Sequence, residues 1–166
     1  MIPRREILEG KFQGVLQSHK ADSEESRLES NAEELFKVTY ISSALKRALE
    51  RVNEKLTGVS NQGAVLIVGP YGAGKTHGLI TLYHILKEPQ IAKNWLRNWK
   101  VEVALPSSTK TCIISTRRYD VDFIWEPVFS KLGRSDILSK IKRFPTVDHI
   151  EEIIGYETCA IFIDEI

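Results

Sequence analysis

A glycine-rich segment at residues 69–76, Gly-Pro-Tyr-Gly-Ala-Gly-Lys-Thr, constrains this chain more than any other feature. It directly follows a continuous apolar run at residues 64–68 and precedes a helical pattern that extends to about residue 86. The run does not alternate with polar residues, which is typical of a strand covered on both faces in a parallel sheet. The helix must end before Pro89, because proline cannot continue it. The sequence therefore predicts a strand, a glycine loop and a helix in that order.

The segment fulfils the pattern G-x-x-x-x-G-K-[ST], in which main-chain N–H groups surround a polyphosphate. Wrapping a triphosphate needs space beside the backbone and positive φ values, which favours glycine at Gly69, Gly72 and Gly74. The following helix adds the positive end of its dipole. We expect Lys75 to contact the β and γ oxygens and stabilise the charge of the reacting phosphoryl group, and Thr76 to bind magnesium. The predicted nucleotide-binding residues are Gly69, Pro70, Tyr71, Gly72, Ala73, Gly74, Lys75, Thr76 and His77.

Two acidic residues, Asp164 and Glu165, follow a second apolar run at residues 159–163. Ligands of parallel sheets bind at the carboxyl ends of the strands, so a strand that ends in acids can face a bound nucleotide. We expect Asp164 to hold magnesium, directly or through water, and Glu165 to activate the water that attacks the γ-phosphate. The adjacent glutamate favours a hydrolase that carries its own base over a kinase. Taken alone, the pair also fits the start of a solvated loop.

The remaining pattern predicts an α/β fold with a mostly parallel sheet. Residues 1–37 are interpreted as a polar, loosely held N-terminal arm, and residues 38–166 as one domain. A helix is expected where apolar residues share one stripe, with Thr39 as its cap and Gly58 at its end. A further strand is expected at residues 111–116, and helices at residues 91–100, 123–132 and 146–154. The stripe consists of Ile41, Leu45, Leu49, Val52 and Leu56.

Composition narrows the classes of function only slightly. The chain is 42% apolar and 27% charged, with 23 basic and 22 acidic side chains, so its charge indicates no acidic partner. Cys112 and Cys159 lie in short apolar runs, which favours buried thiols in a reducing compartment over a disulfide. No window approaches the roughly 18 apolar residues of a membrane span. We therefore expect a cytoplasmic protein without a membrane partner.

Histidines, tryptophans and basic side chains offer weaker candidates. His77 and His84 are seven residues apart, too far for one metal site on a helix, and His77 could either approach the γ-phosphate or simply pack. Trp95 and Trp99 could stack on bases, but packing on the domain is the favoured interpretation. The basic groups at residues 117–118 and 140–143 are interpreted as solvated surface.

The two acids and the glycine loop together resemble the catalytic-glutamate branch of P-loop ATPases, in particular the AAA+ group. The run at residues 74–84, Gly-Lys-Thr-His-Gly-Leu-Ile-Thr-Leu-Tyr-His, is similar to a poorly characterised family of large archaeal and bacterial AAA+-like ATPases. Val38-Thr39-Tyr40 and Ile124-Trp125-Glu126 are similar as well. The resemblance covers about residues 36–166.

The resemblance implies a P-loop three-layer sandwich that binds ATP and Mg²⁺. Members of this branch insert a further strand between the phosphate-loop strand and the acidic strand. They also carry a helical lid and an arginine finger. None of these maps onto the present residues. The resemblance therefore leads us to expect a truncated fragment of a longer protein, which extends from the Walker A motif (residues 69–76) to the Walker B motif (Asp164 and Glu165).

The resemblance also implies a homo-oligomer for the full-length protein and DNA or phage-defence partners. The sequence lacks the Asn-Lys-x-Asp motif that reads guanine, so we do not expect a preference for GTP. Three functions fit the residues: an ATP hydrolase, an ATP-binding regulatory module without effective turnover, and a small-molecule or polynucleotide kinase.

Overall fold

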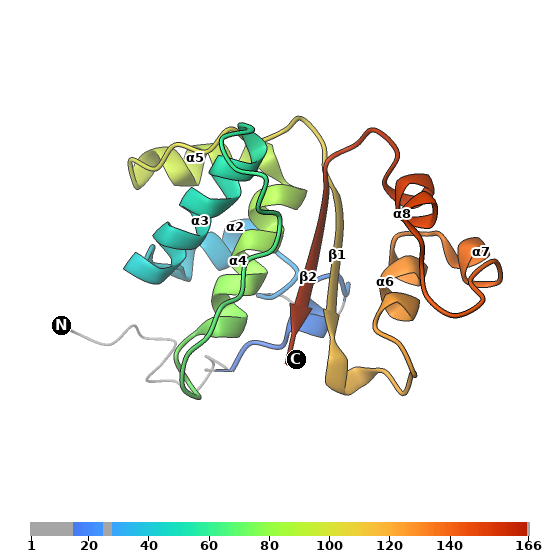
Figure 1. The fold of residues 1–166 in the computed structure, drawn as a ribbon. Coiled ribbons are helices and arrows are strands. Elements are labelled where there is room, and N and C mark those ends of the chain that lie inside the picture. Colours follow the sequence, from blue (N-terminus) through green and yellow to red (C-terminus); the bar gives the residue numbers. More distant parts are fainter. Residues whose placement is uncertain (1–14, 25–27, 166) are drawn as a thin grey trace.

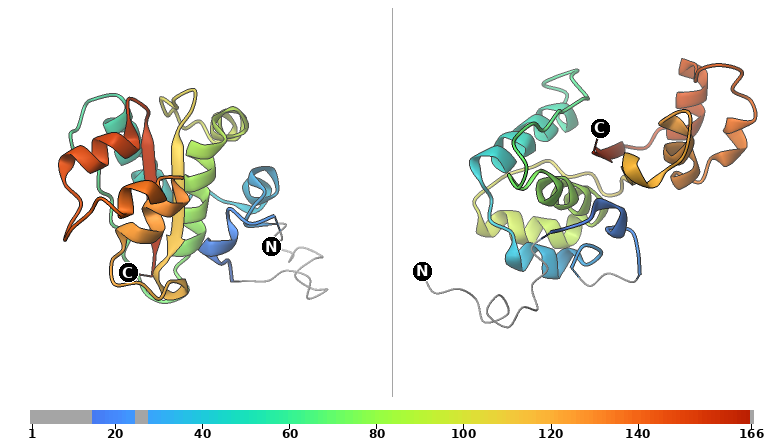
Figure 2. Two further views of the ribbon diagram at one scale, coloured as in Figure 1. Left: turned by 90° about the vertical axis from the view of Figure 1, so that its right-hand side faces the viewer. Right: turned by 90° about the horizontal axis from the view of Figure 1, so that it is seen from below.

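The computed structural model describes residues 15–24 and 28–165. In this part of the chain, β1 (Lys110–Ser115) and β2 (Cys159–Asp164) pair in parallel and form a two-stranded sheet. Helices lie on both sides of this sheet (Figures 1 and 2). On one side are α2 (Ala32–Val38), α3 (Ser43–Leu56), α4 (Lys75–Lys87) and α5 (Pro89–Asn98), and on the other are α6 (Trp125–Lys131), α7 (Ser135–Leu138) and α8 (Val147–Ile154). The fold is therefore mixed α/β, with helical layers flanking a parallel sheet. Two short 3-10 helices, η1 (Ser18–Lys20) and η2 (Thr116–Arg118), complete it.

β1 separates two apolar cores. Successive side chains of a strand point to opposite faces of the sheet. Ile113 accordingly packs with α2 to α5, whereas its neighbours Cys112 and Ile114 pack with Val128 and Phe129 of α6 on the other side. The sequence predicted both strands, and the parallel pairing of Ser115 with Asp164 brings their carboxyl ends to the same edge.

The helix predicted from the apolar stripe forms as α3, but its cap differs from the prediction. Ser42 is the N-cap, and its side chain accepts a hydrogen bond from the Leu45 amide at 3.2 Å. Thr39 instead ends α2. Leu45 and Leu49 are buried, as the stripe predicts, and Gly58 follows the helix with a φ of 74°. The error arose because both Thr39 and Ser42 are suitable capping residues.

The helix after the glycine loop is confirmed as α4, and the predicted helices at residues 91–100, 123–132 and 146–154 appear as α5, α6 and α8. α5 begins at Pro89 rather than two residues later, because proline is well suited to the first helical position. The short helix α7 was not predicted.

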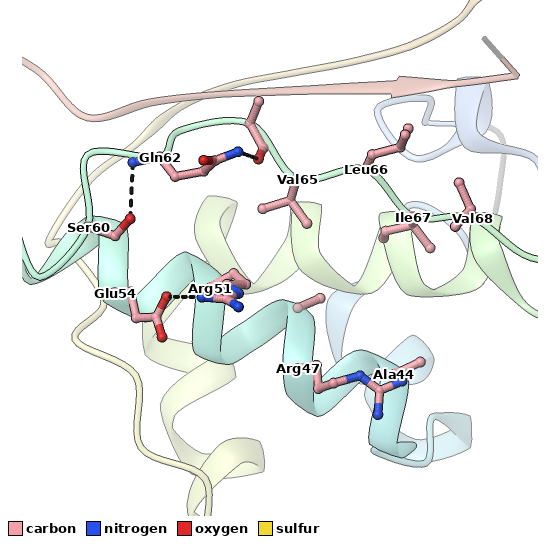
Figure 3. Close-up of a pocket in the computed structure, with 12 residues that line it drawn as sticks. Ala44, Arg47, Arg51, Glu54, Ser60, Gln62, Val65, Leu66, Ile67 and Val68 are labelled. Carbon is pink, nitrogen blue, oxygen red and sulfur yellow. Dashed lines mark hydrogen bonds and ion pairs between the residues drawn. The ribbon is translucent and has the colours of Figure 1, made fainter.

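The predicted strand at residues 64–68 is wrong, since this segment is extended but belongs to no sheet among the described residues. Figure 3 shows that Val65 and Ile67 point toward the helices, whereas Leu66 and Val68 point away. The exposed fractions agree, with 45% for Val65, 76% for Leu66 and 79% for Val68. The segment runs in the same direction as β2 (Figures 1 and 3), so it has the alternation and direction of a strand without a hydrogen-bonded neighbour.

The N-terminal arm is less loose than the sequence indicated. Within its described part, Ala21, Leu35 and Phe36 are buried in the first core, and the ring of Phe36 stacks on Trp95 at 4.7 Å. Asn31 caps α2 by accepting from the Glu34 amide. The division of the chain at residue 37 stays a prediction, and residues 1–14 and 25–27 of the arm lie outside the described residues.

Both cysteines are free thiols, as predicted. Cys112 is buried in the second core, and this burial raises the pKa of its thiol to about 11. None of the helices in the described ranges has both the length and the apolar character that a membrane span requires.

Candidate functional site

The glycine loop connects the extended segment 64–68 to α4. Gly72 and Gly74 have φ values of 78° and 79°, in the left-handed region that favours glycine. A Cβ atom at either position would meet nothing within 4 Å, so here conformation rather than space explains these two glycines. Gly74 is also the N-cap of α4, and it has no side chain with which to satisfy the first amides of the helix. The loop therefore leaves main-chain N–H groups for an anion.

Lys75 lies over this loop in the structure. Its Nζ atom donates hydrogen bonds to the carbonyl oxygens of Gly69 and Pro70, both at 2.8 Å. The ammonium group is thus held against the same turn whose amides the sequence assigned to phosphate.

Thr76 connects the glycine loop to the acidic end of β2. Its Oγ1 atom donates a hydrogen bond to Oδ2 of Asp164 at 3.0 Å, although the two residues are 88 positions apart. The structure thereby brings together the two residues that the sequence assigned to magnesium. Their oxygens are the kind of ligand that Mg²⁺ prefers.

Glu165 is held by residues at the carboxyl end of β1 and directly after it. Ser115 Oγ donates to Glu165 Oε2 at 2.5 Å, and a guanidinium nitrogen of Arg117 lies 3.2 Å from Oε1. The Thr116 hydroxyl donates to the main-chain oxygen of Glu165, which itself has a φ of 61°, unusual for a residue other than glycine. The candidate base is therefore fixed by contacts at both carboxylate oxygens and at its backbone.

Sequence reasoning missed Ser115 and Thr116 and interpreted Arg117 as solvated surface. Arg117 is indeed 78% exposed at its side chain, but it forms an ion pair with Glu165. The available signal was the position of all three residues at or directly after the carboxyl end of the strand predicted at residues 111–116, because parallel strands have their carboxyl ends at one edge of the sheet.

His77 directly follows Thr76, and its ring is directed to the N-terminal helices. Its Nε2 atom lies 2.7 Å from Oγ1 of Thr39. Burial lowers the pKa of His77 below its ordinary value of 6.5. A direct contact of His77 with nucleotide stays a prediction.

The pKa of His77 leads to a prediction about acid stability. Because the folded chain favours the neutral ring, it binds fewer protons than the unfolded chain once the pH falls below about 6.5. Its stability should therefore decrease with falling pH, by at most about 1.4 kcal/mol per pH unit for this one proton. In His77→Gln, which does not titrate, urea unfolding at pH 7.5 and 5.5 should give a smaller difference in the free energy of unfolding. The pKa of His19 is also lowered, mainly by burial, but its contribution to the pH dependence of stability is present in both proteins and cancels in the comparison. Equal pH-dependent differences in the wild type and in His77→Gln would therefore contradict the prediction.

The tryptophans mostly pack, as the favoured interpretation had it. Trp95 stacks on Phe36, and Trp99 meets Tyr40 edge to face at 5.0 Å while it stays 37% exposed. His84 is buried within the first helical layer rather than placed at the glycine loop.

A groove with a volume of about 630 Å³ lies between α3 and the segment at residues 60–68 (Figure 3). Arg47, Arg51 and Glu54 of α3 form one wall, and Arg51 donates to Glu54 at 2.8 Å. None of residues 69–76 lines it. The groove is therefore separate from the glycine loop and marks the unpaired flank of the segment at residues 64–68.

Comparison with known protein families gives a match over the N-terminal part of the chain. The family described as "DUF499 N-terminal domain" matches residues 19–105, slightly more than half of the chain, from η1 through the glycine loop to the end of α5 and beyond. No curated protein matches, and no solved structure matches. The matched span contains Thr39, residues 69–76 and His77 but not Asp164 or Glu165. On this match, the chain belongs to the DUF499 N-terminal domain family.

Proposed function

We propose that this chain binds Mg-ATP at residues 69–76 and hydrolyses it, as the N-terminal part of an AAA+-like P-loop ATPase. The observation that carries the proposal is the hydrogen bond between Thr76 and Asp164. If residues 69–76 were only a glycine turn that happens to end in Lys-Thr, a hydrogen bond from Thr76 to the acidic end of a strand 88 positions later would not be expected. A site for a metal-bound polyphosphate requires that meeting.

The phosphates would be held by the turn and by the first amides of α4. The left-handed glycines give the turn the backbone conformation that the motif needs, and the helix dipole favours negative charge at this end. Lys75 would exchange the carbonyl oxygens of Gly69 and Pro70 for β and γ oxygens of the nucleotide. That ammonium then offsets the charge that develops on the γ-phosphoryl group.

Thr76 and Asp164 would hold magnesium together with phosphate oxygens and water. Mg²⁺ is commonly bound by one or two protein oxygens plus substrate phosphates, which fits this small donor set. Among the described residues no three or more His, Cys, Asp or Glu side chains form a metal cluster, so an all-protein cage is not part of the proposal. When bound, the ion would neutralise negative charge on the phosphate oxygens.

Glu165 would accept the proton of the attacking water. As the new oxygen–phosphorus bond forms, the bond from the γ-phosphorus to the bridging oxygen breaks and ADP leaves. To reach that water, the carboxylate must exchange at least one of its contacts with Ser115 and Arg117. These contacts favour a second candidate function, an ATP-binding regulatory module that orders its loops without effective turnover.

The test is phosphate release as a function of Mg²⁺ concentration in the wild type and in Asp164→Asn. The variant keeps the size of the side chain but loses its charge, so we expect the Mg²⁺ concentration for half-maximal release to rise roughly tenfold. Asp120→Asn, at an exposed aspartate that precedes α6, is the matched control and should behave as the wild type. Binding of Mg-ATP without any release of phosphate would favour the regulatory module, and absence of both would refute the two candidates.

A further inference from the structure

Two histidines of α4 reach the two ends of the segment that contains α2. They are seven residues apart, about two helical turns, and therefore share one face of α4. Nε2 of His77 lies 2.7 Å from the Thr39 hydroxyl, directly after α2, and Nε2 of His84 lies 2.7 Å from the carbonyl oxygen of Glu29, before α2. α2 is thereby attached to α4 at a point beside the glycine loop and at a point far from it.

The chemistry of the Thr39 hydroxyl determines the direction of the nearer bond. Its Oγ1 atom donates to the Leu35 carbonyl oxygen at 2.7 Å, which uses its only proton. His77 must then donate from Nε2, so its ring is the Nε2–H form. Thr39 is buried, and its hydroxyl is fixed on the last turn of α2 before it accepts from His77. The contact is thus a hydrogen bond with a defined donor, His77 Nε2–H, and a defined acceptor, Thr39 Oγ1, and we call it the Thr39–His77 anchor.

The anchor is attached to the first turn of α4, where the proposed phosphate contacts lie. His77 is the immediate neighbour of Thr76, which reaches Asp164, and it is two positions from Lys75. The Thr81 hydroxyl also contacts this residue, donating to the His77 carbonyl oxygen at 2.7 Å, but this bond lies within α4 and does not reach α2. The contact of the His77 ring with Thr39 therefore connects the first turn of α4, which also contains Lys75 and Thr76, to the end of α2.

We propose that Thr39 is a positioning residue for the glycine loop: it holds His77, and through His77 the first turn of α4, in the arrangement that receives phosphate. The inference about affinity rests on the proposed function, whereas the inference about the order of the loop does not. It assigns a role to two positions, 38 residues apart, whose connection only the fold makes visible.

The affinity for Mg-ATP, measured by calorimetry, tests the first part. Thr39→Val removes the acceptor for His77, and with it the hydroxyl that donates to the Leu35 carbonyl oxygen, at nearly constant volume, and should weaken binding about tenfold. Thr39→Ser keeps the hydroxyl and should stay within about twofold of the wild type. Thr81→Val is the matched control, since it removes another buried threonine hydroxyl bonded to His77, and should also stay within about twofold.

A double-mutant cycle separates positioning from a general loss of stability. His77→Phe keeps a ring but removes the Nε2–H donor, so alone it should weaken binding about as much as Thr39→Val. Combined with Thr39→Val it should add little, because both changes break the same bond. Fully additive losses, or equal affinities for Thr39→Val and Thr81→Val, would overturn the proposal. If Thr39→Val does not fold, amide exchange in His77→Phe and Thr81→Val decides instead, because the exchange of the loop amides without nucleotide does not depend on a direct contact of His77 with ATP.

Amide hydrogen exchange measured by NMR supplies the second, nucleotide-free readout. In Thr39→Val the amides of Gly72, Gly74 and Thr76 should exchange faster than in the wild type, and in Thr81→Val they should not. Unchanged exchange in Thr39→Val would overturn the positioning role even if ATP binds. A wild type that binds no Mg-ATP would instead refute the proposed function, and the exchange data would still decide the role of Thr39.

Discussion

Glu165→Gln should reduce the rate of phosphate release by roughly 100-fold to 10,000-fold while the affinity for Mg-ATP changes by no more than about twofold. The amide cannot accept the proton of the attacking water, but it keeps the size of the side chain and one oxygen that can still accept from Ser115 or from Arg117. Binding depends on the glycine loop and should persist. The measurements are single-turnover phosphate release and calorimetric titration of the same protein samples.

Glu157→Gln is the matched control for this prediction. Glu157 is ion-paired with Lys110 at 2.7 Å, just before β2, so the same chemical change is made at the opposite end of the strand. It should leave phosphate release within about twofold of the wild type. Equal turnover by Glu165→Gln and wild type would show that Glu165 is not the base.

The sequence predicted the two strands and α4 correctly because their signals are local. β1 and β2 are short apolar runs that end in polar residues, and α4 begins where the glycines end and stops before Pro89. The contact of Thr76 with Asp164 also agrees with a general rule, because Asp164 ends a parallel strand and Thr76 follows the loop after an extended segment that runs in the same direction.

The strand at residues 64–68 could not be predicted correctly from its own residues. A run of apolar, β-branched residues reports a preference for an extended backbone, but a strand also needs a partner for its N–H and C=O groups. The resemblance places a further strand between this segment and the acidic strand. In the described chain β2 pairs with β1 alone, Ile161 of β2 is 45% exposed, and the segment keeps its alternation without a ladder.

Helix α2 was not predicted, although the sequence contains a signal for it. Asn31 followed by Glu34 is a capping pattern, and Leu35 with Phe36 supplies the apolar contact. The acidic and polar residues that precede it outweighed this short pattern. The contacts of Thr39 with His77 and of Ser115 with Glu165 depend on tertiary structure, and the order of residues along the chain does not reveal such pairs.

Lys75→Ala should weaken the affinity for Mg-ATP by at least about 100-fold, which corresponds to about 2.8 kcal/mol. The ammonium is the one full positive charge that the motif directs at the β and γ oxygens, and charge-assisted hydrogen bonds are the strong ones. The structure already holds this group against the turn, at the Gly69 and Pro70 carbonyl oxygens. Lys87→Ala, at the other end of α4, is the matched control and should stay within about twofold of the wild type.

Calorimetric titration of the folded wild type and of Lys75→Ala with Mg-ATP tests the central claim most directly, with circular dichroism as the check that both proteins are folded. The account predicts saturable heat of binding for the wild type and for Lys87→Ala, and its loss in Lys75→Ala. Absence of binding by the wild type, or equal binding by Lys75→Ala, would contradict the assignment of residues 69–76 to a nucleotide triphosphate.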